Sequence, residues 1–488
     1  MKHLQFHLLM LAATLVAGCR PPAVTFPVEP VSRSDNATGW DTDDDGQADF
    51  FLIAPNGRIS RIGYDRTGDG RPDHVIDLDE IPVGHTRHLV IVLDGFSWDV
   101  VYEFRKQGNL RMFHEPSKVV APYPVLTDLS MQDLFEHIPA HGYEAEFYDL
   151  SAGKVRGGEW AYLKSQNAPY GRFFHYKAPV WLDPVGYLLP RPFFRREIHS
   201  IKRNFDDFAD KEYIAYIVST AGISTKYSRQ GQVEALCWLQ RLCRQVLWEN
   251  HGLVKITMLS DHGHSYTAGR RVEMEEHLES EGWKLTNKLN GPRDVVYIRF
   301  GLLTAIAMYT HSPAKLAEDT LSCQGVELAS YADGSDVVVL SADGGRARVR
   351  RKGDRYGYER IEGDPLELAE ILSRIEADAD GLYAGADLLA ATIDHHWPAP
   401  LQRLHRAHLG LVENPADVLV SLGDAYYSGS KTFSGRVSVA STHGSLNWIN
   451  SVAFVMSTAG PLPPAMLTRQ ISPEMRKLLG RHWPLRQE

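Results

Sequence analysis

The sequence predicts an α/β fold in which helices cover both faces of a central, mostly parallel sheet. Three strand-like stretches carry this prediction: residues 89–93, 254–259 and 437–440. The first is apolar throughout, which is typical of a strand buried on both faces, as strands of parallel sheets are. Each stretch leads into acidic or histidine residues close to a glycine. Because ligands of such sheets bind just beyond the carboxyl ends of the strands, the sequence also predicts where a site would lie.

The residues at these strand ends are suited to binding a metal ion. Asp94 follows the first stretch, Asp261 and His262 follow the second, and His443 follows the third. A single Asp at a strand end is most simply a turn or a helix cap, but the same pattern occurs three times. Carboxylates and imidazoles are ligands for divalent ions such as zinc or manganese. We therefore predict a site for a divalent ion such as zinc or manganese.

Further elements are predicted along the chain from apolar periodicity and turn residues. These are helices at 97–107, 128–137 and 231–249, strands at 213–218 and 451–456, and a hairpin of strands 337–340 and 347–350. Residues 320–412 differ in character from their surroundings, and we interpret them as an insertion that caps the sheet. Residues 417–421 are expected to resume that sheet.

Length and composition set broad limits. The chain has 488 residues, 43% of them hydrophobic, which is enough for a large core and for more than one domain. Its formal net charge of −9 argues against a nucleic-acid-binding surface.

The N-terminus has the features of a targeting segment. Residues 1–18 combine a basic start with a short apolar stretch, and the residues before Cys19 resemble a bacterial lipobox, which implies a lipid attached to Cys19. The alternative is an ordinary secretory signal with an incidental cysteine. Residues 19–38, rich in proline, are interpreted as a tether. The chain is then expected to be a membrane-anchored protein of the bacterial cell envelope that faces the periplasm or the exterior.

An acidic unit occurs twice within residues 39–81. Oxygen-bearing side chains at alternate positions, a glycine for a sharp turn and a later Asp are what a loop wrapped around Ca²⁺ requires. The candidate calcium ligands are Asp41, Asp43, Asp45 and Asp49 in the first copy and Asp65, Thr67, Asp69 and Asp73 in the second. The alternative is a solvated acidic linker.

Four motifs in this order resemble the alkaline phosphatase superfamily, and within it the type I phosphodiesterase and nucleotide pyrophosphatase branch. They are residues 92–95, 124–127, 259–263 and 441–445. The resemblance implies an alkaline-phosphatase-like domain over residues 84–488. It also implies two metal ions beside a Ser or Thr nucleophile.

By this resemblance Asp94, Thr127, Asp261 and His262 surround one ion, and His443 binds the other. The second ion also needs an Asp-x-x-x-His motif, expected within residues 218–227. One alignment places Ala221 and Thr225 at its two positions, and a second alignment places Ser219 and Ile223 there, so neither supplies the ligands. The resemblance therefore implies one tightly bound zinc or manganese ion and a doubtful second.

The sequence thus predicts metal-dependent hydrolysis or transfer of a phosphoester, with Thr127 as nucleophile. The alternative is a catalytically inactive member of the superfamily that serves as a binding or structural lipoprotein. A Thr hydroxyl is a weak nucleophile that a metal or base must activate, so the state of the metal site separates the two hypotheses.

Overall fold

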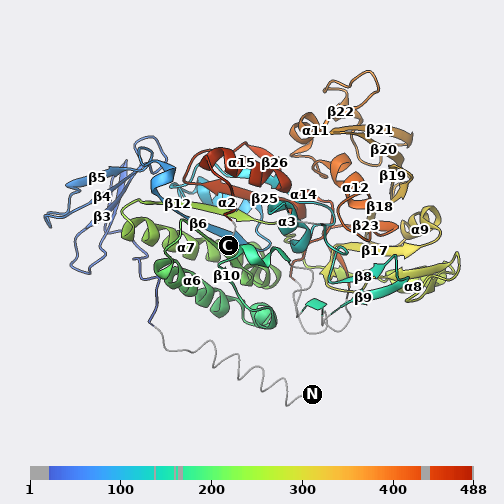
Figure 1. The fold of residues 1–488 in the computed structure, drawn as a ribbon, viewed down its shortest axis with the longest axis horizontal. Coiled ribbons are helices and arrows are strands. Elements are labelled where there is room, and N and C mark those ends of the chain that lie inside the picture. The colour runs from blue at the N-terminus through green and yellow to red at the C-terminus, as the bar shows by residue number, and fades with distance from the viewer. Residues whose placement is uncertain (1–20, 137–138, 159–160, 163–168, 430–439, 486–488) are drawn as a thin grey trace, which may run out of the picture.

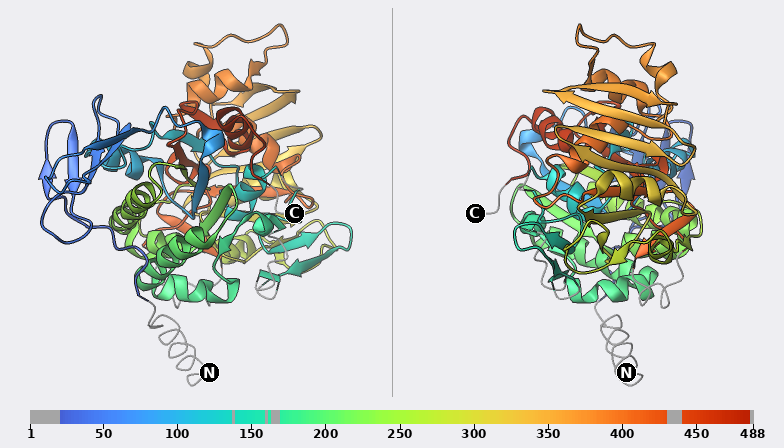
Figure 2. Two further views of the ribbon diagram at one scale, coloured as in Figure 1. Left: turned by 60° about the vertical axis from the view of Figure 1, so that its left-hand side comes forward. Right: turned by 90° about the vertical axis from the view of Figure 1, so that its right-hand side faces the viewer.

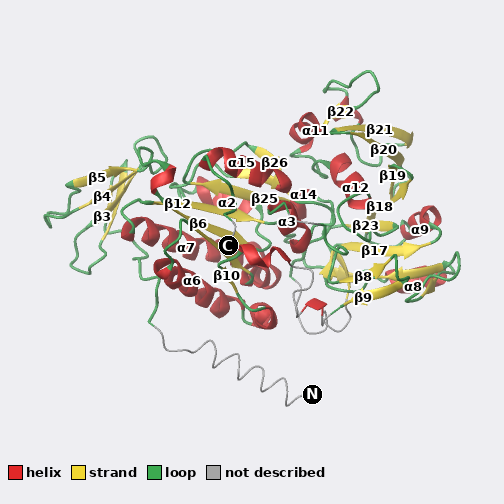
Figure 3. Cartoon of the chain, in the orientation of Figure 1, coloured by secondary structure: helices red, strands yellow, loops and turns green. Residues whose placement is uncertain are grey.

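The computed structural model describes residues 21–136, 139–158, 161–162, 169–429 and 440–485. Three main sheets follow one another across the molecule, as Figure 1 and Figure 3 show: a small N-terminal sheet, a central sheet between helices, and a large second sheet. Two small groups complete the strands. They are β8 (Glu146–Asp149) with β9 (Lys154–Gly157), and β13 (Arg270–Arg271), β24 (Tyr426–Gly429) and β16 (Leu302–Leu303).

The central sheet has seven strands and is mostly parallel, as predicted. In spatial order they are β10 (Tyr176–Lys177), β11 (Glu212–Ile217), β6 (Arg87–Leu93), β12 (Val254–Ser260), β25 (Val452–Ser457), β7 (Ser117–Val120) and β26 (Ala465–Leu467). Only β25 runs antiparallel to its neighbours. The predicted strand 437–440 lies outside the described residues except for Ala440.

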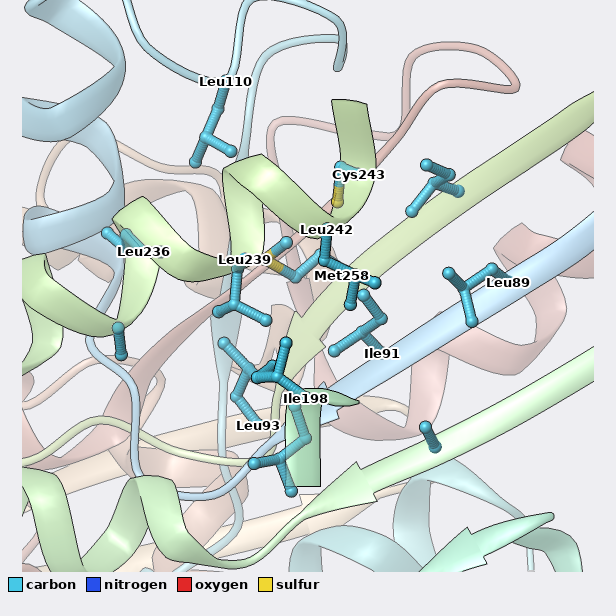
Figure 4. Packing of buried hydrophobic residues seen from close by; sticks show 14 of the residues in the cluster. Leu89, Ile91, Leu93, Leu110, Ile198, Leu236, Leu239, Leu242, Cys243 and Met258 are labelled. Atoms are coloured by element: carbon cyan, nitrogen blue, oxygen red, sulfur yellow. The ribbon is translucent and has the colours of Figure 1, made fainter. Parts of the chain in front are cut away.

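Alternation along β6 explains why helices cover both faces of this sheet. Leu89, Ile91 and Leu93 pack on one side, whereas Val90 and Val92 pack on the other, and all five are fully buried. The first side is covered by α2 (Trp98–Lys106), α6 (Pro190–Asp207) and α7 (Ser219–Glu249), and the second by α3 (Thr127–Leu134) and α15 (Ile471–Leu479). Figure 4 shows side chains of β6 between those of α6 and α7. The predicted helix 231–249 is the second part of α7, which kinks at Ser228 where φ is 52°.

The second sheet differs from the predicted cap. It has nine strands: β14 (Lys284–Leu285), β15 (Asp294–Tyr297), β17 (Ala305–Thr310), β23 (Val418–Leu422), β18 (Val326–Asp333), β19 (Asp336–Ser341), β20 (Arg346–Lys352), β21 (Arg355–Glu362) and β22 (Tyr383–Ala384). The stretch 417–421 does not resume the central sheet, because β23 pairs with β17 and β18 instead. The interpreted insertion 320–412 is therefore one part of a larger sheet, seen face-on in the right-hand view of Figure 2.

Helices cover this second sheet as well. They are α8 (Met274–Ser280), α9 (Pro313–Thr320), α10 (Ala369–Leu372), α11 (Gly385–Thr392) and α12 (Pro400–His408). The remaining α-helices, α5 (Asp183–Leu188) and α14 (Trp448–Ser451), lie close to the strand ends of the central sheet. The predicted hairpin is formed by β19 and β20.

The N-terminal sheet is antiparallel and docks on the far end of the central domain. Its strands are β1 (Ser32–Arg33), β2 (Ala37–Trp40), β3 (Phe50–Ile53), β4 (Arg61–Tyr64) and β5 (His74–Asp77). The Tyr64 hydroxyl donates to the Trp248 carbonyl at 2.7 Å, and the Lys255 ammonium donates to the Leu78 carbonyl at 2.7 Å. Phe26, within the segment interpreted as a tether, is buried against this sheet.

Candidate metal centre

The pairing of two neighbouring strands places the acidic ligands beside each other. β6 and β12 are parallel, and Ser260 pairs with Leu93 in their register. The next residue of each strand is therefore Asp261 or Asp94, at the same edge of the sheet. Thr127, the first residue of α3 rather than its cap, reaches the same point.

Asp94, Asp261 and His262 form one compact buried group. Each offers one ligand atom, and these atoms all lie within 4.8 Å of one another. The Nε2 atom of His262 is 3.4 Å from Oδ2 of Asp261 and 3.8 Å from Oδ1 of Asp94. The structure thus brings together three residues that are far apart in sequence, in an arrangement suited to a cation.

Hydrogen bonds orient Asp261 and His262 and leave one possible ligand atom of each free. Oδ1 of Asp261 accepts from the backbone N–H groups of Gly95 at 2.9 Å and His262 at 2.8 Å. Oδ2 of Asp261 is buried and accepts no hydrogen bond from the described residues. Nδ1 of His262 lies 2.7 Å from the Gly263 carbonyl, which can only accept, so the proton is on Nδ1 and Nε2 keeps its lone pair. This is how proteins commonly orient histidine ligands.

The electrostatics of the group call for a positive charge. Burial, together with the charge of Asp261, raises the pKa of Asp94 well above its usual range. Burial raises the pKa of Asp261 to about 7 and lowers the pKa of His262 to about 4. Both carboxyl groups resist ionisation, and the imidazole beside them is neutral. A divalent cation bound here would stabilise the ionised form of both carboxyl groups, so the group fits such an ion.

Gly95 is required immediately after Asp94. Its φ of 66° lies in the left-handed region, and a Cβ there would be 3.0 Å from the ring of His264. Glycine therefore lets the chain turn at the strand end while the histidines pack close to it.

Thr127 stands beside the metal-binding group. Its Oγ1 is 3.2 Å from Nε2 of His262 and 3.5 Å from Oδ1 of Asp94. The residue is partly exposed, whereas the three acidic and histidine side chains are buried. A hydroxyl in this position can meet a substrate while it shares a cation with the buried group.

His443 also lies next to the group. Its ring stacks on that of His262 with centroids 4.1 Å apart, and its Nδ1 lies 2.8 Å from the Val125 carbonyl. The proton is therefore on Nδ1, and Nε2 keeps a lone pair. Burial and the neighbouring His262 hold the pKa of His443 well below its usual range, so the ring is neutral.

The segment expected to complete a second metal site contains no carboxylate. Ala221 is buried at the start of α7, and Oγ1 of Thr225 lies 3.5 Å from Nε2 of His264. Nδ1 of His264 bonds to the Ser441 hydroxyl, so both ring nitrogens face hydroxyl groups. Lys226 points away, and its ammonium donates to the Leu188 carbonyl at 2.8 Å.

Sequence reasoning missed Tyr216 and Thr220. The Tyr216 hydroxyl donates to Oδ2 of Asp94, and the Thr220 hydroxyl accepts from the backbone N–H of Asp94 at 2.8 Å. Tyr216 is the penultimate residue of β11, which lies next to β6. A search for polar residues near the ends of all strands would have found it, although the pairing of β11 with β6 is not visible in the sequence.

We expect Tyr216→Phe to weaken metal binding about 10- to 100-fold, the usual cost of losing a partner of a ligand. Removing the hydroxyl leaves the Asp94 carboxylate less stabilised, so its pKa rises further and protons compete with the metal at higher pH. Calorimetric titration with zinc from pH 6 to about pH 8 should show the variant losing the ion at a higher pH than the wild type.

Tyr213→Phe is the matched control, because Tyr213 is on the same strand and its buried hydroxyl has no hydrogen-bond partner among the described residues. Equal zinc affinity for wild type and Tyr216→Phe across the titration would contradict this role of Tyr216.

The two acidic loops share one backbone geometry. Gly46 donates to Asp41 at 2.8 Å and Gly70 donates to Asp65 at 2.6 Å, between equivalent positions of the two copies. The last Asp of each copy accepts in the same way, Asp49 from Thr42 and Asp73 from Arg66, both at 2.7 Å. Carboxylate oxygens of Asp41, Asp43 and Asp45 lie within 4.8 Å of one another.

The predicted lipidation residue, Cys19, lies outside the described residues. Among the residues that the structure does describe, no helix is both long and apolar enough to cross a bilayer.

The fold and the site together define an α/β protein with a candidate metal centre at the carboxyl end of its central sheet. No protein-family model and no curated protein matches the sequence. Among solved structures, the chain is similar to human ectonucleotide pyrophosphatase/phosphodiesterase 5, with a TM-score of 0.45, 11% identity, and 82% of this chain and 96% of that one covered. The murine protein has a TM-score of 0.44 and 11% identity, with 82% of this chain and 97% of that one covered. The inactive murine variant in complex with AMP has a TM-score of 0.44 and 10% identity, with the same two coverages.

Proposed function

We propose that the protein hydrolyses or transfers a phosphoester, with Thr127 as the nucleophile and one zinc or manganese ion held by Asp94, Asp261 and His262. The observation that carries this proposal is the position of the Thr127 hydroxyl. It lies within 3.5 Å of the buried Asp94 carboxylate and of the neutral His262 nitrogen. These two residues and Asp261 offer ligand atoms that lie close to one another. Two carboxylates and one imidazole suit both metals.

The reaction requires two displacements at phosphorus. Oγ1 of Thr127 forms a bond to phosphorus as the bond to the leaving oxygen breaks, and the departing alcohol takes up a proton. Water, or an acceptor alcohol, then displaces the threonine, which regains its proton. The Asp94 carboxylate is close enough to take the Thr127 proton, whereas the Nε2 lone pair of His262 would be used by the ion.

A bound divalent ion would supply two further effects, lowering the pKa of the hydroxyl and polarising a phosphoryl oxygen. With no carboxylate at Ala221 and no imidazole at Thr225, we propose one tight ion per chain. His443, neutral and stacked on His262, would then be available to contact the substrate.

Two measurements on the purified full chain test this proposal. Elemental analysis should find close to one zinc or manganese ion per chain, and a chromogenic phosphodiester should be hydrolysed at a rate that falls on chelation. A chain that binds the ion yet leaves phosphodiesters and phosphomonoesters intact would instead favour the inactive binding protein.

We also propose that the chain is anchored to the cell envelope through a lipid on Cys19. Labelled fatty acid should be incorporated into the wild type and not into Cys19→Ala, because the thiol is the attachment point. Gel fluorography with membrane fractionation measures this. A Cys19→Ala chain that still carries the label would contradict the proposal.

Finally, we propose that both acidic loops bind Ca²⁺. Chelation should then speed hydrogen exchange in residues 39–80 and leave the central sheet unchanged, because the ion would neutralise carboxylates only within the loops. Asp41→Asn with Asp65→Asn should remove the response. Asp77→Asn is the control, since Asp77 pairs with Arg61 at 2.9 Å outside both loops. A full chain that takes up no Ca²⁺ by calorimetry would overturn the proposal.

A further inference from the structure

Two neighbouring helices carry a cluster of positive side chains on the surface opposite α3. On α6, Arg191, Arg195, His199 and Arg203 are spaced four residues apart and so lie along one side of the helix. α7 packs beside α6 (Figure 1). Trp238 of α7 lies on this side because it contacts His199 and Arg195 of α6. Arg241 of α7 lies there too, because it contacts the N-terminal segment at Phe26. We call Arg195, Arg203, Arg241 and Trp238 the arginine face.

The charges of the arginine face are not neutralised by carboxylates. Arg191 pairs with Glu234 at 2.7 Å and is left out for that reason. Arg195, Arg203 and Arg241 form no ion pair with any carboxylate of the described residues.

The contacts of these arginines are with neutral groups. Arg195 and Arg241 lie over the Trp238 ring, 5.2 and 4.9 Å from its centroid. Burial and the three neighbouring arginines hold the pKa of His199 below its usual range, so this ring is neutral. The face therefore carries three uncompensated positive charges around a partly exposed tryptophan.

The start of the described chain lies on this same face. The backbone N–H groups of Ala23 and Val24 point to Nδ1 of His199, at 3.2 and 3.0 Å. Arg203 donates to the Pro21 carbonyl at 3.3 Å, and Arg241 donates to the Phe26 carbonyl at 2.9 Å. The segment is thus held in the seam between α6 and α7, and Pro21 is only two residues from Cys19.

We propose that the arginine face lies against anionic phospholipid headgroups when the chain is anchored at Cys19. This inference rests on the lipid anchor of the proposed function. With only Arg20 between Cys19 and a residue fixed on α6, a lipid on Cys19 brings this face, and no other, to the bilayer surface. The lipid alone holds the chain at the bilayer, and a basic patch beside it adds electrostatic attraction to anionic headgroups.

The size of the effect follows from the number of charges. Each arginine close to an anionic bilayer strengthens binding by about fivefold, and salt weakens it. Trp238 lies between the arginines, so it should approach the headgroups together with them. Figure 2 shows α6 and α7, drawn in green, on the side of the molecule away from the outer strands of the second sheet.

The test uses the lipidated full chain in vesicles that contain a phospholipid spin-labelled at its headgroup. The fluorescence of Trp238 is obtained by subtracting that of Trp238→Phe. We expect strong quenching of Trp238 in phosphatidylglycerol vesicles, and weak quenching in phosphatidylcholine vesicles or at high salt. Arg195→Glu with Arg203→Glu should abolish the difference between the two lipids.

Arg350→Glu with Arg351→Glu is the matched control, because both arginines are exposed on β20 of the second sheet and neither pairs with a carboxylate of the described residues. That variant should behave as the wild type, and both variants should keep their circular dichroism and turnover. Quenching that is equal in the two lipids, or that survives charge reversal on α6, would overturn the proposal. Shielding of Trp238 that grows with protein density would instead identify a second copy as the partner.

The outcomes separate this proposal from the anchor itself. A chain that takes up no fatty acid at Cys19 would remove the anchor. A labelled chain whose Trp238 ignores lipid charge would remove only the arginine face.

Discussion

Thr127→Ala should keep the metal ion and lose turnover by on the order of 10⁴-fold or more. The substitution removes the nucleophile, while Asp94, Asp261 and His262 keep their positions because none depends on the Thr127 hydroxyl for its backbone hydrogen bonds. Elemental analysis and hydrolysis of a chromogenic phosphodiester should be run on the same preparation.

Two variants sharpen this experiment. Thr127→Ser keeps a hydroxyl and should retain part of the activity. Ser130→Ala lies on the same helix, and because the Ser130 hydroxyl is buried with no partner among the described residues, this change should be nearly neutral. Turnover by Thr127→Ala at the wild-type rate would show that another group attacks phosphorus.

Asp261→Asn should lower metal affinity by more than about 100-fold, because an amide is a poor substitute for a charged ligand and this carboxylate lies at the centre of the group. The amide oxygen can still accept from Gly95 and His262, so the loop should keep its shape. Calorimetric titration with zinc measures the loss.

The pH dependence of the stability of the same variant tests the role of Asp261 independently. After chelation, burial raises the pKa of Asp261 from 3.8 to about 7, so the folded wild type binds a proton more tightly than the unfolded chain. Its free energy of unfolding should therefore fall as the pH rises from about 4 to about 7. Asp261→Asn has no carboxyl group to ionise here and does not lose this stability. Without metal, the variant should therefore melt at a higher temperature than the wild type at pH 8. Near pH 3.5 the ionisation of Asp261 should make no difference between the two proteins.

With saturating zinc the order of the two proteins should reverse, because only the wild type gains the free energy of metal binding. Thermal unfolding at several pH values, with and without zinc, measures all four cases. A variant that melts below the wild type in every case would show that Asp261 has a structural role and not a metal-binding one.

Much of the central sheet could be predicted because its signals are local. Residues 89–93 are apolar at every position, so they form a strand wherever both faces can be covered, and the turn at Gly95 follows directly. The hairpin of β19 and β20 was predicted for the same reason. Asp94, Asp261 and His262 could be identified as candidates because each follows such a signal.

The partners of each strand could not be predicted in this way. Residues 417–421 read as a strand, but nothing in their own composition says that β23 pairs with β17 and β18 and not with the central sheet. Likewise, proline-rich composition predicts a tether, whereas burial of Phe26 depends on a pocket formed by distant residues.

The sequence by itself determined the elements of the central sheet and the residue types that end its strands, because side-chain alternation and glycine turns act over a few residues. The tertiary structure alone decided what those residues can do together. The register that pairs Ser260 with Leu93 puts two carboxylates side by side, the approach of β11 adds the Tyr216 hydroxyl, and α3 brings Thr127 within 3.5 Å of Asp94. These contacts join segments that are distant in the chain, so they follow from the packing of whole layers, to which no short stretch of sequence is a guide.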